Sequence, residues 1–422
     1  MRTHKRLQQD ESHVGAVSSS ALEDEVEDVV GPANNSTATR LLMKAGAALC
    51  FVGASALVLQ LAPMLDLDAN VPRHHESMPP DFPPPMPVAS PLTPLFPLGL
   101  ARWPIFIDNA TVYNALKRAS VINRSWRFND TELFSYVHIS KTGGSTFITW
   151  VNASRFFSRF YPRVSAGQEH GHLYDRVQRP HAQRLVFLRS PRGHVLSMFK
   201  ECRYDDWGVR LIRSNLSTVP HAGTHQHDFE KWINFYIMRA TGNNTGKNSM
   251  GCYDPWNFQA RFMTSWSARP NWAALHEGYD PSIDAVLTSY LEMDWVGLTD
   301  FYDESLCLLL SRLQSRAAAA TFKKSCNCQD TNRSALMNVP IERHGSVSSS
   351  AVDIYPELAA KMDRLTAVDS LLFSVALHGF FSDIKWLEAR VGFRVMCPDT
   401  LRKAEPKLAY IANVTELYDM AI

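Results

Sequence analysis

The residue types best suited to chemistry gather in the segment 136–147, which reads YVHISKTGGSTF. A short apolar run ends near Lys141, two glycines follow, and an apolar helical pattern begins. Glycines let the backbone approach a ligand closely, and the first N–H groups of a helix bind anions. Lys141 adds a mobile cation, and nearby hydroxyl groups add donors. The residues expected to bind a phosphate-type anion are Lys141, Thr142, Gly143, Gly144, Ser145 and Thr146.

The order of these residues separates the motif from the Walker phosphate-binding loop. In the Walker pattern the lysine follows the glycines, whereas Lys141 precedes them. A plain Gly-Gly turn with a solvated lysine is the alternative if the motif stands alone.

A second basic motif follows at 185–197, which reads LVFLRSPRGHVLS. A buried strand is expected to end at Arg189, whose guanidinium can bind a phosphate through two hydrogen bonds. Ser197, two helical turns later, can add a hydroxyl to the same anion. Open α/β sheets bind nucleotides at the carboxyl ends of their strands, so the two motifs are expected to form one site.

Two histidines lie between these motifs, in the segment Glu169–Tyr174. On an extended segment, residues two apart share a face, so His170 and His172 are expected to line the same cleft. Histidine is suited to proton transfer near neutral pH. We expect His172 to be the general base, with His170 assisting and Glu169 as a weaker alternative. A metal-binding pair and two surface histidines are the other interpretations, and we expect no metal.

The charge of the chain is concentrated in this same region. The whole chain has 43 basic and 42 acidic residues, whereas His138–Arg213 has thirteen basic and five acidic residues, a net charge of +8. The overall balance excludes a broadly basic nucleic-acid-binding protein, and the local excess predicts an anionic partner. Arginines and lysines after the two motifs either line a groove for an acidic glycan or are solvated: Arg155, Arg159, Arg163, Lys200, Arg203, Arg210 and Arg213.

Outside this region, the chain is organised as an anchor, a spacer and a domain. Residues 1–44 are polar and expected to be a disordered cytosolic tail. Residues 45–65 contain no charge and are long enough to span a bilayer, with basic residues before them and acidic residues after them. Residues 66–104 form a proline-rich stem, and residues 105–422 a lumenal domain. A signal peptide and a buried core helix are the alternatives for 45–65.

Strand-like and helix-like segments alternate within the domain. Expected strands are 133–139, 184–189 and 295–299; expected helices are 144–160, 191–204, 229–240, 256–266, 304–315 and 356–387. This alternation predicts an α/β fold, a P-loop-like three-layer domain with a mainly parallel sheet flanked by helices.

The cysteines fit an oxidising compartment. Cys50 lies in the expected anchor, and an even number follows: Cys202, Cys252, Cys307, Cys326, Cys328 and Cys397. Up to three disulfides are expected, with the pairing open and buried free thiols as the alternative. The spacing of Cys326 and Cys328 fits no standard zinc site. Glycosylation sequons beyond the anchor occur at Asn109, Asn123, Asn129, Asn152, Asn215, Asn243, Asn332 and Asn413.

The two motifs, in this order, resemble those of sulfotransferases that use 3′-phosphoadenylyl sulfate (PAPS). The similarity is greatest to the Golgi membrane-bound heparan sulfate 2-O- and 6-O-sulfotransferase group and to algal sulfotransferase-domain proteins. It covers roughly 130–390 and includes the segments 296–307 (VGLTDFYDESLC), His344-Gly345 and 365–372 (LTAVDSLL).

This resemblance implies specific roles for several residues. Lys141 would contact the bridging oxygen of the phosphosulfate, and 143–146 would hold the 5′-phosphate. Arg189 and Ser197 would hold the 3′-phosphate, and His172 aligns with a histidine base. The chain departs from the family at Ser190, where aspartate is usual, and at His194, where arginine is usual.

The expected function is sulfuryl transfer from PAPS to a carbohydrate hydroxyl, by a single-pass type II Golgi membrane protein with no nucleic-acid partner. Protein-tyrosine or small-molecule sulfation is one alternative, and a P-loop kinase is another. A non-catalytic protein that binds nucleotides or glycans on the same fold is the third.

Overall fold

The computed structural model describes residues 128, 134–154, 171–205, 207–210, 225–242, 252–265, 278–313, 316–331 and 354–421. All of them belong to the unit Pro83–Ile422. The expected tail (1–44), anchor (45–65) and stem (66–104) lie outside the described residues, so these three predictions stay predictions.

The centre of the domain is a three-stranded parallel sheet. Strands β1 (Phe134–Val137), β2 (Gln183–Leu188) and β3 (Trp295–Leu298) lie in the order β1-β2-β3. Tyr136 pairs with Leu185, which in turn pairs with Trp295. Every residue of β1 and β3 is buried, as expected for parallel strands covered on both faces. The described strands coincide with the three predicted ones within three residues at either end.

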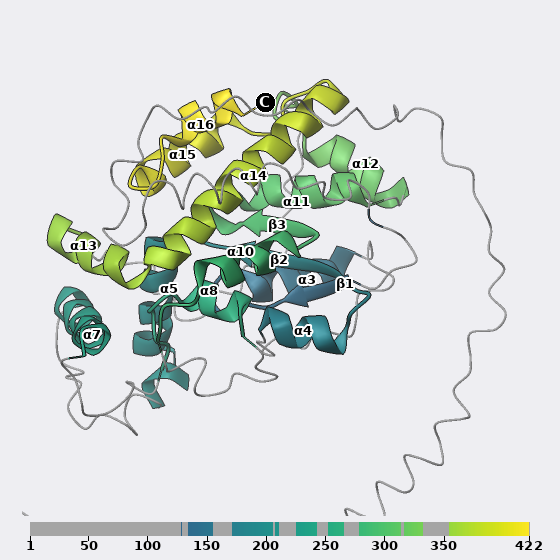
Figure 1. Ribbon diagram of the computed structural model, residues 1–422. Helices are drawn as coiled ribbons and strands as arrows, with labels where there is room; N and C mark the ends of the chain where they lie inside the picture. Colours follow the sequence, from purple (N-terminus) through teal and green to yellow (C-terminus); the bar gives the residue numbers. More distant parts are fainter. Residues whose placement is uncertain are drawn as a thin grey trace, which may run out of the picture. The chain divides into compact units, whose positions relative to one another are not determined.

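Helices flank this sheet (Figure 1). Those before β3 are α3 (Gly144–Ser154), α4 (His172–Gln178), α5 (Pro191–Tyr204), α7 (His225–Ala240), α8 (Phe258–Met263) and α10 (Ile283–Leu291). Those after it are η3 (Thr299–Phe301), α11 (Tyr302–Arg312), α12 (Arg316–Ser325), α13 (Pro356–Leu365), α14 (Ala367–Val391), α15 (Pro398–Leu408) and α16 (Val414–Met420). The predicted α/β class is confirmed at this level.

The long helix predicted over 356–387 is two helices. The chain leaves helical geometry at Thr366, where φ is −119° and ψ is 29°, and α14 then continues to Val391. Asn257 stabilises the break, because its side-chain oxygen accepts the N–H of Val368 at 2.9 Å and caps the start of α14. The prediction of one helix was wrong because this cap comes from a segment more than 100 residues earlier.

Within the described residues, α14 is the one helix long and apolar enough to cross a membrane. Its most apolar window is 78% buried inside the domain, and it packs against β3, α8, α11 and α16. We therefore interpret α14 as the core helix of the domain. It does not overlap the predicted anchor at 45–65.

Three disulfides confirm the expectation from the cysteine count. They join Cys202 to Cys252, Cys307 to Cys326, and Cys328 to Cys397. Cys326 and Cys328 thus have different covalent partners, which removes the zinc alternative. Each disulfide fastens the end of a helix to a distant segment and restricts the unfolded chain.

Candidate functional site

The carboxyl ends of the three strands bring the two predicted motifs together. β1 leads into the residues Ser140–Gly143, here called the β1–α3 turn, and then into α3. β2 leads through Arg189 and Ser190 into α5, and β3 leads into η3 and α11. Because the strands are parallel neighbours, all three connections meet at one edge of the sheet.

Each carbonyl group of the β1–α3 turn accepts a hydrogen bond from a side chain that follows β2 or β3. The donors are His194 Nε2 to Ser140 O (2.8 Å), Arg189 Nη1 to Lys141 O (3.1 Å), Thr299 Oγ1 to Thr142 O (2.6 Å) and Tyr302 OH to Gly143 O (3.2 Å). In a trans peptide the next N–H points opposite to the carbonyl. The N–H groups of 141–144 are therefore held facing away from these donors, as in an anion-binding turn.

The backbone of the turn is left-handed at two residues. Lys141 has φ +64° and Gly143 has φ +89°, both in the left-handed region. For lysine this conformation costs about 1–2 kcal/mol, and such strain is concentrated at functional sites. Gly144 has no room for a side chain, because an added Cβ would lie 2.2 Å from Cδ2 of His138.

Lys141 has an acidic partner that the sequence did not reveal. Its ammonium group contacts the carboxylate of Glu201 on α5, and the two side chains are 14% and 13% exposed. Glu201 lies seven residues after His194 and four after Ser197, so these three positions share one face of α5. That helical spacing is the signal that would have found Glu201.

Arg189 is fixed through its backbone and its side chain. Its N–H donates to Gln259 Oε1, and its carbonyl accepts from Gln259 Nε2, both at 2.9 Å. Burial lowers the pKa of Arg189, and the charge of Asp300 opposes that shift. Thr299 Oγ1 also lies 3.1 Å from Leu188 O, so the single proton of this hydroxyl is shared between carbonyls that follow β1 and end β2. Neither Gln259 nor Thr299 carried a predicted role.

The structure gives a reason for serine at position 190, where the resembled sulfotransferases usually have aspartate. Both its N–H and its hydroxyl donate to Asp300, each at 2.9 Å. A carboxylate in place of Ser190 would lie against that of Asp300. The acidic group at this position is thus supplied by the segment after β3.

At position 194, where the resembled sulfotransferases usually have arginine, this chain has a histidine that carries no charge. The Ser140 carbonyl can only accept, so Nε2 of His194 carries the proton. Burial lowers the pKa of His194 to about 3, and the nearby charges of Arg189 and Lys141 act in the same direction. His194 is therefore neutral at physiological pH and supplies no positive charge for a ligand.

The hydroxyl groups of the first motif differ in their surroundings. Thr142 is buried and its Oγ1 donates back to Ile139 O at 2.9 Å, so this hydroxyl stabilises the turn itself. Ser145 and Thr146 lie in the first turn of α3, whose N–H groups have no acceptor within the helix. Ser197 lies on α5, between His194 and Glu201 on the same face.

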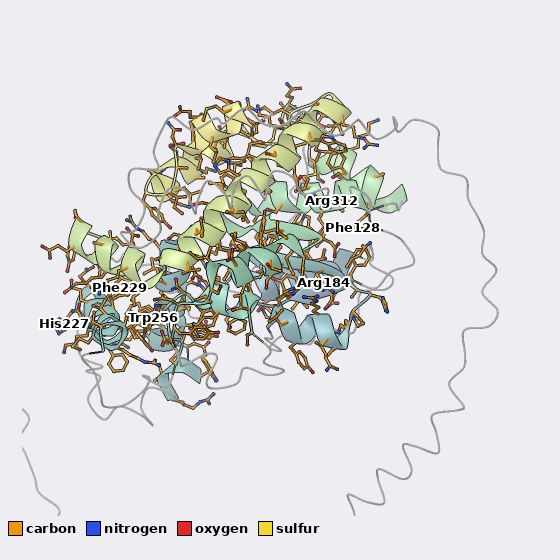
Figure 2. All side chains as sticks on the ribbon, viewed as in Figure 1. Phe128, Arg184, His227, Phe229, Trp256 and Arg312 are labelled. Atoms are coloured by element: carbon orange, nitrogen blue, oxygen red, sulfur yellow. A yellow bond between two sulfur atoms is a disulfide. The ribbon has the colours of Figure 1, made fainter. Side chains whose placement is uncertain are left out.

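His172 lies in a separate cluster. It is completely buried, its Nε2 lies 2.8 Å from Glu292 Oε2, and Arg176 Nη1 contacts the other carboxylate oxygen at 2.6 Å. Glu292 comes just before β3, and its carbonyl accepts from Arg184 near the start of β2. Figure 2 labels Arg184 near α4. The described contacts therefore attach His172 to the amino-terminal side of the sheet and do not join it to Lys141 or Arg189.

The extended segment predicted around the histidines is wrong at His172, which is the first residue of α4. The start of this helix is stabilised from another segment, because the Ser265 carbonyl accepts the N–H of Tyr174 at 3.3 Å. Gly171 passes close to the same group, and an added Cβ would lie 2.3 Å from the Ser265 carbonyl oxygen. His170 and Glu169 lie outside the described residues. Among the described residues, no group of three or more metal-ligating side chains is present.

Among the described cations considered for an acceptor groove, Arg203 is tied to a carboxylate, because its Nε donates to Asp228 at 2.7 Å. Arg192, which was not among those cations, binds Asp363 through two hydrogen bonds of 2.7 and 2.6 Å. Arg155, Arg159, Arg163 and Arg213 lie outside the described residues, and Lys200 and Arg210 lie on described helical segments.

Comparisons with known proteins add no family assignment: no protein-family model, no curated protein and no solved structure matches this chain.

Proposed function

We propose that this protein is a PAPS-dependent sulfotransferase that acts on a hydroxyl of a carbohydrate. The observation that carries the proposal is the β1–α3 turn, whose four carbonyls are tied back by side chains while Lys141 and Arg189 lie beside it. PAPS presents two anionic groups, a 5′-phosphosulfate and a 3′-phosphate. Two cations at the carboxyl ends of adjacent parallel strands suit a ligand with two such groups.

Each residue then has a defined task. Lys141 neutralises charge that develops on the bridging oxygen as the sulfur–oxygen bond breaks. The N–H groups of 143–146 bind the 5′-phosphate, and Arg189 and Ser197 bind the 3′-phosphate. Asp300 and Gln259 keep the segment after β2 in place.

The wider setting belongs to the same proposal. We propose a P-loop-like three-layer domain, held in the Golgi lumen by a type II anchor at 45–65 and a stem at 66–104. The three disulfides support an oxidising compartment. A carbohydrate acceptor follows from the resemblance to the heparan sulfate enzymes and from the net charge of +8 over His138–Arg213.

Calorimetry with 3′,5′-ADP, the product of the donor, tests the proposal directly. We expect the full-length protein in detergent to bind it, and Lys141→Ala or Arg189→Ala to abolish binding. Lys403→Ala removes an exposed cation on α15 and serves as the matched control. No binding by the wild-type protein would refute the proposed function.

Radiolabelled PAPS with a panel of glycans and peptides then tests the acceptor class. Label on a glycan supports the proposal. Label only on tyrosine peptides would select the protein-tyrosine alternative, and nucleotide binding with no transfer would select the non-catalytic one.

A further inference from the structure

The carboxylate of Glu201 occupies a place where the proposed function requires an anion. Lys141 is the residue that would meet the phosphosulfate, and its ammonium group contacts Glu201. Both side chains are largely buried, so this ion pair is only weakly screened by solvent. A donor that binds Lys141 must therefore displace Glu201 or share Lys141 with it.

The position of Glu201 is fixed by its helix. On one face of α5, His194 contacts the Ser140 carbonyl, and Glu201 contacts Lys141 seven residues later, about 10 Å along the axis. The next residue, Cys202, is buried and bonded to Cys252. The carboxylate thus stands beside the ammonium group on a rigid support, with only its own side-chain torsions free to change.

Three other titratable groups that could accept a proton have different partners. Asp300 accepts two hydrogen bonds from Ser190. His194 is neutral with its Nε2 proton committed to Ser140. His172 is completely buried and paired with Glu292 on the amino-terminal side of the sheet.

From this arrangement, and given the proposed sulfotransferase function, we infer that Glu201 is the proton acceptor of the reaction. Donor binding transfers Lys141 from Glu201 to the bridging oxygen and leaves the carboxylate beside the sulfuryl group. The acceptor oxygen then forms a bond to sulfur, its proton passes to Glu201, and the bond from sulfur to the bridging oxygen breaks. Its electron pair leaves on the phosphate of 3′,5′-ADP.

The substitution Glu201→Gln tests this inference because it keeps the size of the side chain and removes the charge. Two readouts are needed: 3′,5′-ADP affinity by calorimetry, and turnover of PAPS to 3′,5′-ADP and sulfate with water as acceptor. We expect tighter 3′,5′-ADP binding, since the competing carboxylate is gone. We expect turnover to fall by about 10²–10⁴-fold, the range for loss of a general base. Glu357→Gln, at an exposed position of α13, is the matched control.

The opposite directions of the two effects make the test decisive. If both the affinity for 3′,5′-ADP and the turnover rise, Glu201 only blocks the site. If both fall, Glu201 has a structural role. Either result overturns the inference. Turnover that persists in Glu201→Gln but is lost in His172→Gln would assign the base to His172. All three outcomes leave the proposed function standing, whereas failure of the wild-type protein to bind 3′,5′-ADP would overturn the function itself.

Discussion

Single residues at this site are defined by what surrounds them as much as by their type. His194 is the clearest case, because burial keeps this basic side chain neutral in the folded protein. Its proton lies on Nε2 and points to the Ser140 carbonyl. His194 therefore supports the backbone of the turn and contributes no charge at neutral pH.

The buried state of His194 predicts a pH dependence of stability. Its pKa is about 3 in the folded protein and near 6.5 when unfolded, so the unfolded state binds more protons between these values. The unfolding free energy is therefore unaffected by His194 above about pH 6.5 and falls as pH drops toward 3, by at most about 1.4 kcal/mol per pH unit.

Urea denaturation between pH 7.5 and 4.5 measures this effect. We expect the slope of unfolding free energy against pH to be smaller in His194→Gln, which keeps a donor for Ser140 but does not titrate. Equal slopes in the two proteins would show that His194 is not buried in its neutral form.

The residues that follow β3 connect the elements of the site by hydrogen bonds to the β1–α3 turn. Thr299 and Tyr302 donate to the carbonyls of Thr142 and Gly143, so η3 and α11 shape a turn more than 150 residues earlier. An alteration after β3 is therefore expected to change ligand binding at the β1–α3 turn.

Thr299→Val isolates this connection, since valine matches the shape of threonine and lacks the hydroxyl. The Thr142 carbonyl would lose its donor, which it shares with the carbonyl of Leu188, and an unsatisfied buried polar group costs about 1–3 kcal/mol. We expect a lower melting temperature and about tenfold weaker 3′,5′-ADP binding, which corresponds to about 1.4 kcal/mol. Ser311→Ala removes a hydroxyl that bonds within α11 and should leave binding intact. Equal affinity of Thr299→Val and wild type would contradict the role given to this hydroxyl.

The sequence predicted those strands and turns whose conformation depends on neighbouring residues in the chain. The parallel strands read as continuous apolar runs because both of their faces are buried. The glycines indicated the turn because Gly143 adopts a positive φ angle, which suits few other residues, whereas the positive φ of Lys141 had no signal in the sequence. Gln259 and Asp300 had no local signal, because they reach the site from segments 70 and 110 residues away from their partners, and Glu201 was marked only by its helical spacing from His194 and Ser197. His172 was misjudged because the start of its helix is stabilised by a distant segment, where the Ser265 carbonyl accepts the N–H of Tyr174.

The described part of the domain is held together by one hydrophobic core and three disulfides. The disulfide Cys202–Cys252 is attached to α5 directly after Glu201, on the helix that also carries Ser197. The disulfide Cys328–Cys397 joins two segments that contain no residue of the candidate site. The two bonds are thus expected to differ in their effect on ligand binding.

Replacing each pair by serine tests this difference. Loss of the 50-residue loop of Cys202–Cys252 is expected to lower the unfolding free energy by about 4 kcal/mol and to weaken 3′,5′-ADP binding. Loss of Cys328–Cys397 should lower stability with little change in affinity. Thermal denaturation and calorimetry on both variants provide the measurement; equal effects on affinity would show that α5 is positioned independently of its disulfide.

The core helix α14 also has a consequence for biosynthesis. With a mean hydropathy of 1.3 over its most apolar window, it is nearly a stop-transfer sequence while the chain is still unfolded. Asp369 caps α8 through the N–H groups of Ala260 and Gln259, and an aspartate within a membrane segment is unfavourable. In a domain translocated as proposed, the same carboxylate that completes the fold also favours passage of α14 through the translocon over its arrest in the bilayer.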